Sequence, residues 1–198
     1  LKQYPQAIEF YQQTLVGLRD ISDRQGEGNI LATLGLTYES LREYQRAITT
    51  YQQALVILRE TGDRQRERSV LRNLGDVYFA QGQYQQAIDF FQQSLTVARE
   101  LGDRQREAST VLAIGNANFA LGRTQQAISL YQQSLAISRE IGDQQWEMNA
   151  LGNLATAHKT LGEYSQAIEF HQQALAIARK IGDRVGEGKI LGNLGITY

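Results

Sequence analysis

The tripeptide Gly62-Asp63-Arg64 decides the fold, because it returns at a constant interval along the chain. The same three residues stand at 102–104 and at 182–184, Gly-Asp-Gln stands at 142–144, and Ser-Asp-Arg stands at 22–24. Each successive copy begins 40 residues after the one before it. A fixed period of this length indicates an array of one supersecondary unit, in which each copy contacts only its neighbours.

The unit between two copies has the pattern of two helices. Asp63 precedes an apolar-periodic segment, and its short acceptor side chain suits a helix N-cap. Gly82 interrupts the pattern where a left-handed C-terminal residue is expected, and Gly102 ends a second segment. Apolar residues recur at helical spacing in both segments: Val70, Leu71, Leu74, Val77 and Tyr78, then Tyr84, Ala87, Ile88, Phe91, Leu95 and Ala98. Each unit is therefore predicted to be helix A, a tight turn, helix B and a second tight turn.

Small residues recur in the middle of both predicted helices. Helix A carries Gly35, Gly75, Gly115 and Ala155, and helix B carries Ala47, Ala87, Ala127 and Ala167. A glycine inside a helix costs about 1 kcal/mol relative to alanine, so its recurrence indicates a steric demand. We expect the two helix backbones to approach each other closely at these positions.

These residues resemble the signature of the tetratricopeptide repeat, Leu-Gly-x-x-Tyr on helix A and Ala-x-x-x-Phe or Tyr on helix B. The matches are Leu34-Gly35 and Tyr38 with Ala47 and Tyr51, Leu74-Gly75 and Tyr78 with Ala87 and Phe91, and Leu194-Gly195 with Tyr198. The family's usual repeat has about 34 residues and often ends its second helix with proline, whereas this one is longer and has Gly-Asp there. In both features, the length and the missing proline, this repeat resembles the long repeats of kinesin light chains and bacterial Rap regulators. HEAT repeats have a similar length, but the Leu-Gly-x-x-Tyr spacing argues against them.

The resemblance implies an all-α solenoid of antiparallel helix pairs, wound as a right-handed superhelix. Counting along the chain predicts one array over 1–198 with ten helices. A lone helix B at 1–22 comes first, four full repeats follow at 23–62, 63–102, 103–142 and 143–182, and a lone helix A closes the chain at 183–198. We interpret the start, Leu1-Lys2-Gln3-Tyr4 without an initiator Met, as that of an excised piece.

Composition excludes several classes of function. The net charge of −1 and the pI of about 6.2 provide no basic footprint, so we expect no nucleic acid partner. The chain has no cysteine for disulfides or metal ligation, and no apolar run long enough for a membrane span. We therefore expect a cytoplasmic protein without a membrane association and without a cofactor.

The resemblance also implies where a partner binds, because the A helices of such arrays line the concave surface. The position before the signature leucine is asparagine in three units, and a carboxamide pairs well with the backbone of an extended peptide. By the resemblance, Asn73, Asn153 and Asn193 hold a ligand's main chain; the alternative is that they only face solvent or cap a carbonyl. The predicted peptide-binding residues are Arg72, Asn73, Asp76, Phe79, Asn116, Phe119, Asn153, Thr156, Lys159 and Asn193. The partner predicted from these side chains is a protein or peptide segment of mixed charge.

Catalysis has no support in the sequence, so we predict a non-enzymatic scaffold. His158 and His171 occupy aromatic positions of the repeat and are interpreted as packed rings, with no motif that would complete a metal site. The first-turn glutamates and the capping aspartates are explained by the positive end of the helix dipole. The paired glutamines of the B helices, such as Gln52-Gln53, are interpreted as a solvated face.

An alternative function follows from the predicted first and last helices. Ala7, Ile8, Tyr11 and Leu15 are expected to lack a preceding helix A, and Ile190, Leu191, Leu194 and Tyr198 to lack a following helix B. Burying one such side chain contributes about 1.5–3 kcal/mol, so several exposed together favour association. The alternative is thus a structural spacer or self-assembling segment that stacks end to end.

Overall fold

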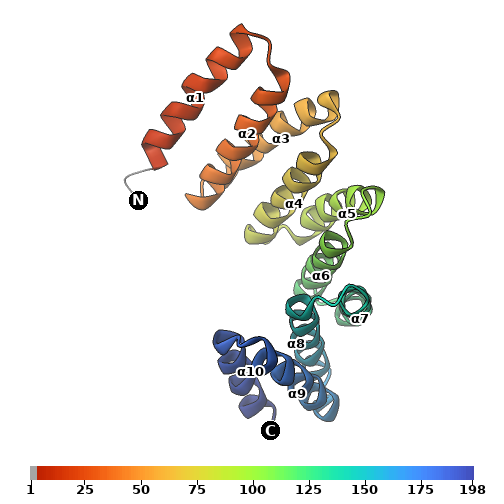
Figure 1. Ribbon diagram of the computed structural model, residues 1–198. Coiled ribbons are helices and arrows are strands. Elements are labelled where there is room, and N and C mark those ends of the chain that lie inside the picture. The colour runs from red at the N-terminus through yellow and green to blue at the C-terminus, as the bar shows by residue number, and fades with distance from the viewer. Residues whose placement is uncertain (1–3) are drawn as a thin grey trace. The chain divides into compact units, whose positions relative to one another are not determined.

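The computed structural model describes residues 4–198, and in that range it consists of ten α-helices without a strand (Figure 1). This confirms the all-helical prediction; what the sequence predicts for Leu1, Lys2 and Gln3 lies outside the described residues. The helices are α1 (Tyr4–Asp20), α2 (Arg24–Ser40), α3 (Tyr44–Thr61), α4 (Arg64–Ala80), α5 (Tyr84–Glu100), α6 (Arg104–Ala120), α7 (Thr124–Glu140), α8 (Gln144–Thr160), α9 (Tyr164–Ile181) and α10 (Arg184–Thr197).

The recurrent aspartate begins every second helix. Asp63 accepts a hydrogen bond from the backbone N–H of Arg66 at 3.0 Å, and the same contact recurs at each of the other four positions. This bond satisfies one of the N–H groups that a helix N-terminus leaves without a partner. At the opposite end of α4, Gly82 has a φ of 75°, the left-handed value expected there. The predicted caps and turns are therefore confirmed.

The helices pack as two compact units, unit 1 from Leu1 to Leu101 and unit 2 from Gly102 to Tyr198. In unit 1, successive helices from α1 to α5 pack on one another, and α2 also contacts α4. Its core includes Leu58, Leu71 and Leu74. In unit 2, successive helices from α6 to α10 pack in the same way, and α6 also contacts α8. Its core includes Leu151 and Leu154. Each unit thus brings two successive A helices into contact, α2 with α4 in unit 1 and α6 with α8 in unit 2.

The mid-helix glycines meet an aromatic ring of the partner helix. A Cβ built on Gly75 would lie 2.3 Å from the Phe91 ring, and Gly35 and Gly115 stand in the same relation to Tyr51 and Tyr131. A contact this short is incompatible with any side chain beyond hydrogen, which confirms the steric demand. The fourth pair has Ala155 and His171 at these two positions. Alanine is larger than glycine, and the imidazole ring is smaller than the ring of Phe or Tyr, so the two changes compensate for each other.

The first-turn glutamates have a role that the helix dipole alone does not describe. Glu67 is only 3% exposed, accepts from Arg59 Nε at 2.8 Å, and also pairs with Arg64, which in turn pairs with Glu100. Glu27 has the same two kinds of partner, Arg19 and Arg24. Burial raises the pKa of Glu27, but the two guanidinium groups outweigh burial and hold that pKa below its usual value. Each buried glutamate therefore links the end of one B helix to the start of the next A helix.

The paired glutamines lie on the solvent side, as predicted, with one addition. Arg59 Nη2 donates to Gln93 Oε1 at 3.1 Å, and Arg139 Nη2 donates to Gln173 Oε1 at 3.4 Å. The second glutamine of a pair therefore also ties one B helix to the next.

The prediction of uncovered apolar residues on the first and last helices is only partly correct. Leu15, Ile190 and Leu194 are buried, because α1 packs on α2 and α10 packs on α9. Leu191 and Tyr198 remain exposed, the latter at 82%. A single neighbouring helix therefore buries one of the four predicted residues on α1 and two of the four on α10.

Candidate functional site

A groove of about 380 Å³ runs over the A helices of unit 2. We call it the unit 2 groove, and its lining comes from α6, α8 and α10 together with one residue of α9. The lining residues are Leu112, Asn116, Met148, Asn149, Gly152, Asn153, Thr156, His171, Gly186, Lys189, Ile190 and Asn193. Four of the predicted binding residues, Asn116, Asn153, Thr156 and Asn193, are thus brought together in one place.

Two of these carboxamides also bond to each other. Asn116 Oδ1 accepts from the Tyr131 hydroxyl at 2.9 Å and from Asn153 Nδ2 at 2.8 Å. Burial raises the pKa of the Tyr131 phenol, so its proton stays in place to donate. The bond uses one of the two amide hydrogens of Asn153 and holds its carboxamide in a fixed orientation. Asn153 is half-buried rather than sealed inside, so part of its hydrogen-bonding capacity still faces the groove.

His171 is the groove residue whose importance the sequence did not reveal. The side chain is 1% exposed, and among the described residues its Nδ1 has no hydrogen-bond partner. Burial lowers its pKa, and the charge of Lys159 lowers it further, so the ring is neutral at physiological pH. The packed-ring interpretation is correct for burial but misses the unpaired nitrogen. The sequence feature that points to His171 is the joint replacement of Gly115 and Tyr131 of the preceding repeat by Ala155 and His171.

His158, the other histidine, is a packed ring. It stacks on Phe170 with centroids 5.2 Å apart, and its Nδ1 contacts the Glu163 carboxylate. Both contacts lie within one helix pair, so they account for this side chain without a ligand.

The predicted residues of unit 1 form a different arrangement. The Tyr51 hydroxyl donates to Glu39 Oε2 at 2.6 Å, and the Asn73 side chain hydrogen-bonds to the same hydroxyl. Arg72 Nε pairs with Asp76 at 3.1 Å. Here charged side chains satisfy one another, while on α2 the buried Asn29 Oδ1 has no hydrogen-bond partner among the described residues.

The remaining predicted residues serve packing as well. Phe79 lies edge-on to Tyr84 at 5.2 Å between ring centroids, and Phe119 packs against the core of unit 2. Lys159 is half-buried and stands close enough to His171 to affect its pKa, but it does not line the groove. The groove residues outside the predicted set are mainly apolar, such as Met148 and Ile190. Lys189, which the sequence suggests for carboxylate recognition together with Arg72 and Lys159, also lines the groove.

Glu39 leads to a prediction about pH. Burial raises its pKa, and the Asp76 charge raises it further, against the lowering effect of the Tyr51 hydrogen bond. A carboxyl group whose folded pKa is above its unfolded value stabilises the fold only while protonated, so this contribution is lost as pH rises. Glu39→Gln is therefore expected to make unit 1 slightly more stable at neutral pH, by less than about 1 kcal/mol. Thermal unfolding at about pH 5 and about pH 7.5 tests this, with Glu9→Gln on exposed α1 as the control. A variant that is less stable than wild type at neutral pH would contradict the assignment.

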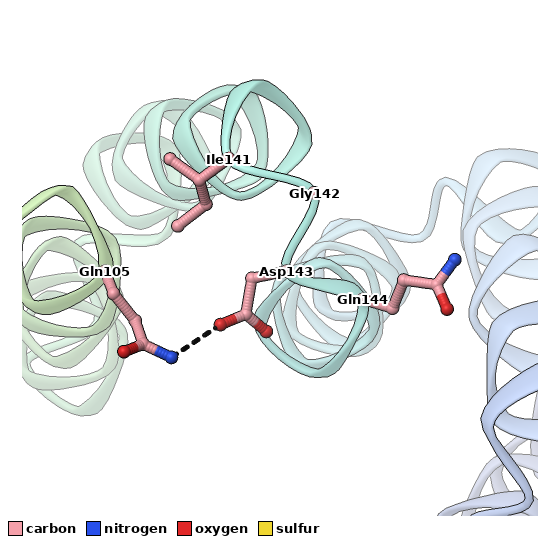
Figure 2. A pocket seen from close by; sticks show the side chains of 5 residues that line it. All are labelled: Gln105, Ile141, Gly142, Asp143 and Gln144. Carbon is pink, nitrogen blue, oxygen red and sulfur yellow. Dashed lines mark hydrogen bonds between the residues drawn. The ribbon is translucent and has the colours of Figure 1, made fainter.

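A second hollow of about 610 Å³ lies at the turn between α7 and α8 (Figure 2). Figure 2 shows Gln105 pointing toward Asp143, and Gln105 Nε2 donates to Asp143 Oδ2 at 2.8 Å. The same bond joins Gln25 to Asp63 in unit 1 at 2.8 Å. Because this bond recurs between successive A helices, we interpret the hollow as part of the contact between these helices rather than as a binding site.

Over residues 4–198, no three His, Asp or Glu side chains come together in a way that would hold a metal ion. None of the ten helices described combines the length and the apolar character that crossing a bilayer requires.

Comparison with known proteins supports the architecture. Structures with a similar fold include BtubC (BKLC) from P. vanneervenii, with 17% identity, 98% of this chain and 83% of that chain covered, and a TM-score of 0.83. A putative kinesin light chain from Podosopora anserina, with nearly identical TPR-like repeats, has 21% identity, covers 91% and 89% of the two chains, and has a TM-score of 0.75. At these identities the likeness concerns the fold.

A third structure is the Rap conjugation gene regulator of the plasmid pLS20, solved in complex with the Phr* peptide. It shares 16% identity and a TM-score of 0.69, and the match covers 96% of this chain but 52% of that chain, so this chain spans about half of that regulator. A comparison with curated protein sequences returned no match.

The family comparison covers the whole sequence. The tetratricopeptide repeat family matches residues 1–60, 30–100, 66–140, 106–180 and 146–198. These matches overlap one another and follow the period of the capped A helices described above. The chain therefore belongs to the tetratricopeptide repeat family.

Proposed function

We propose that residues 1–198 form one array that acts as a non-catalytic protein-interaction scaffold and binds an extended peptide segment along its A helices. The observation that carries this proposal is the unit 2 groove, where Asn153 is held in place by Asn116 and Asn193 is exposed one repeat further on. A carboxamide offers donors and an acceptor together, which matches the alternating N–H and C=O groups of an extended chain.

The composition of the groove supports a peptide over a small apolar ligand. Its polar lining is dominated by Asn116, Asn149, Asn153 and Asn193, with Lys189 as the charged member, while Leu112, Met148 and Ile190 supply apolar surface. Apolar walls with a few fixed polar groups are typical of a site in which contact area provides affinity and hydrogen bonds provide register. A Rap regulator of similar fold has been solved with a peptide, which is consistent with this use of the fold.

The proposal is tested by selection from a random peptide library displayed on phage, with the 198-residue chain as bait. Peptides recovered by the wild type are expected to bind the double variant Asn153→Ala, Asn193→Ala at least about tenfold more weakly, because each lost hydrogen bond removes about 1 kcal/mol. The matched control is Gln132→Ala with Gln133→Ala, two exposed glutamines of α7 that do not line the groove.

Circular dichroism of all three proteins verifies that the helices are retained. Equal binding by the groove variant and the control would reject the groove as the binding surface. A wild-type chain that recovers no peptide above background would reject the proposed function itself.

A second candidate function is self-association, and one observation favours it. On α10, Gly195 has nothing within 4 Å of a Cβ built on it, although its counterparts Gly35, Gly75 and Gly115 each face an aromatic ring. On α1, Tyr11 stands at the corresponding aromatic position of the repeat and is half-buried. We propose that α1 of one copy pairs with α10 of another in the register of an ordinary helix pair. A mass that rises with concentration in sedimentation, together with an empty peptide selection, would favour this candidate over the first.

A further inference from the structure

Gly152 is a glycine inside a helix for which the folded chain gives no packing reason. It lies in the middle of α8, where glycine is less favourable than alanine because its backbone loses more freedom on folding. A Cβ built on Gly152 would meet nothing within 4 Å. A Cβ on Gly35, Gly75 or Gly115 would strike an aromatic ring. Alanine therefore fits at position 152 without strain, and the glycine calls for an explanation outside the fold.

The other helical glycines with open space around them lie on α1 and α10. They are Gly17, Gly188, Gly192 and Gly195. In the part of the chain that the structure describes, α1 packs mainly on α2, and α10 packs mainly on α9. By contrast, α8 packs on α6, α7 and α9. Gly152 is therefore open although its helix packs against three others.

Gly152 opens onto the unit 2 groove. It is one of the lining residues, and α8 is the middle one of the three A helices that form the groove. On α6 the same repeat position is Leu112, a buried side chain that forms part of the groove wall. In unit 1 the position is Ala32 or Arg72, and Arg72 pairs with Asp76. At this repeat position, α8 thus presents bare main chain to the groove.

Hydrogen-bonding side chains flank Gly152 on its own helix. Asn149 lies one turn before it on the same face, and Asn153 follows it directly. Asn153 donates to Asn116 Oδ1 at 2.8 Å, and both Asn149 and Asn153 are half-buried. A ligand atom that rests on Gly152 therefore lies between two carboxamides, each of which offers donors and an acceptor.

We propose that the main chain of the bound peptide crosses α8 in direct contact with Gly152, an inference that rests on the proposed function. The side chains of an extended peptide alternate between two faces, so the backbone between them can lie flat on a glycine. The carboxamides of Asn149 and Asn153 then pair with N–H and C=O groups of the ligand. A helical ligand is disfavoured, because its own side chains surround its backbone and hold it away from Gly152.

Gly152→Ala separates this role from a structural one, because it is expected to change stability and affinity in opposite directions. The new methyl group meets nothing in the free protein, so the melting temperature should rise by about 1–4 °C. The same methyl group lifts the ligand main chain away from α8. Peptides selected by the wild type should therefore bind at least about tenfold more weakly. Circular dichroism measures the first effect, and fluorescence anisotropy with the whole chain measures the second.

The matched control is Gly188→Ala on α10. Gly188 also has nothing within 4 Å of a built Cβ, but it is exposed and does not line the groove. This variant should show a similar rise in melting temperature and bind the peptides as the wild type does.

An alanine scan of one selected peptide decides whether its main chain or one of its side chains rests on Gly152. If the main chain rests there, Gly152→Ala weakens binding of every scanned peptide by a similar factor, because each of them keeps its backbone. If a side chain rests there, the loss disappears for the one peptide in which that side chain is truncated. That result would overturn the proposal.

The remaining outcomes separate this proposal from the proposed function. Peptides that bind Gly152→Ala as tightly as the wild type overturn the contact with Gly152 and leave binding in the groove standing. A Gly152→Ala variant that is less stable than the wild type, or an equal loss of affinity in Gly188→Ala, overturns the contact as well. A wild-type chain that binds no peptide overturns both proposals together.

Discussion

Replacing Gly75 with alanine is expected to destabilise unit 1 by about 1–3 kcal/mol, the usual cost of forcing extra volume into a packed core. The new methyl group would lie 2.3 Å from two carbon atoms of the Phe91 ring, which is itself fully buried and unable to move aside. Alanine is the better helix former by about 1 kcal/mol, so the measured loss is what remains after that gain. Urea unfolding followed by circular dichroism gives the change in free energy.

Two further variants make this result specific. Gly17→Ala on α1 has nothing within 4 Å of the new methyl group, so it is expected to stabilise the same unit by about 0.5–1 kcal/mol. Combining Gly75→Ala with Phe91→His reproduces the pair found in the fourth repeat, Ala155 with His171. The double variant should cost less than the sum of its two single changes, because the smaller ring makes room for the methyl group. Purely additive effects would show that the Phe91 ring is not the reason why glycine is required at position 75.

Replacing Glu67 with glutamine is expected to cost about 2 kcal/mol, since hydrogen bonds to charged groups are worth about 1.5–3 kcal/mol and a buried group keeps the penalty of lost partners. The carboxylate is nearly inaccessible and is held by Arg59 and Arg64. The amide has the same shape, but its NH₂ group would point at an arginine donor and could not accept. The loss therefore measures the charge rather than the packing.

The matched control is Glu43→Gln in the same unit. Glu43 pairs with Arg46, and both side chains are more than a third exposed. Exposed ion pairs contribute about 0–1 kcal/mol, so this change should have little effect on the free energy of unfolding. Guanidinium chloride screens such charges, so urea is the denaturant for both variants. Equal effects of the two changes would show that Glu67 acts only through the helix dipole.

Local signals in the sequence were sufficient for the order, type and ends of the helices. The capping aspartates, the left-handed Gly82 and the apolar stripes are each read within one turn of their own helix, and the structure confirms them. The mid-helix glycines predicted a steric demand, which the structure confirms, but the group that approaches Gly75 is the Phe91 ring and not the backbone of the partner helix that we expected. Because the pattern recurs every 40 residues, the helices predicted in one repeat are supported by the same pattern in the other repeats.

The candidate site was only partly predictable. The position within the repeat was enough to predict Asn116, Asn153 and Asn193 as binding residues, because equivalent residues of a periodic fold lie on the same face. The bond between Asn116 and Asn153 joins side chains that are 37 residues apart. The two arginines that hold Glu67 come from two different helices, α3 and α4. Such pairings are set by how one helix pair packs on the next.

What the sequence by itself determined is thus the family, the helices and the face of each helix that is apolar, since these follow from short-range spacing and from repetition. Only the tertiary structure decided which polar groups remain without a partner. His171 has the same position in its repeat as Tyr131, yet one ring is satisfied and the other is not, because hydrogen-bond satisfaction depends on every neighbour in space and not on the residue's own place in the chain.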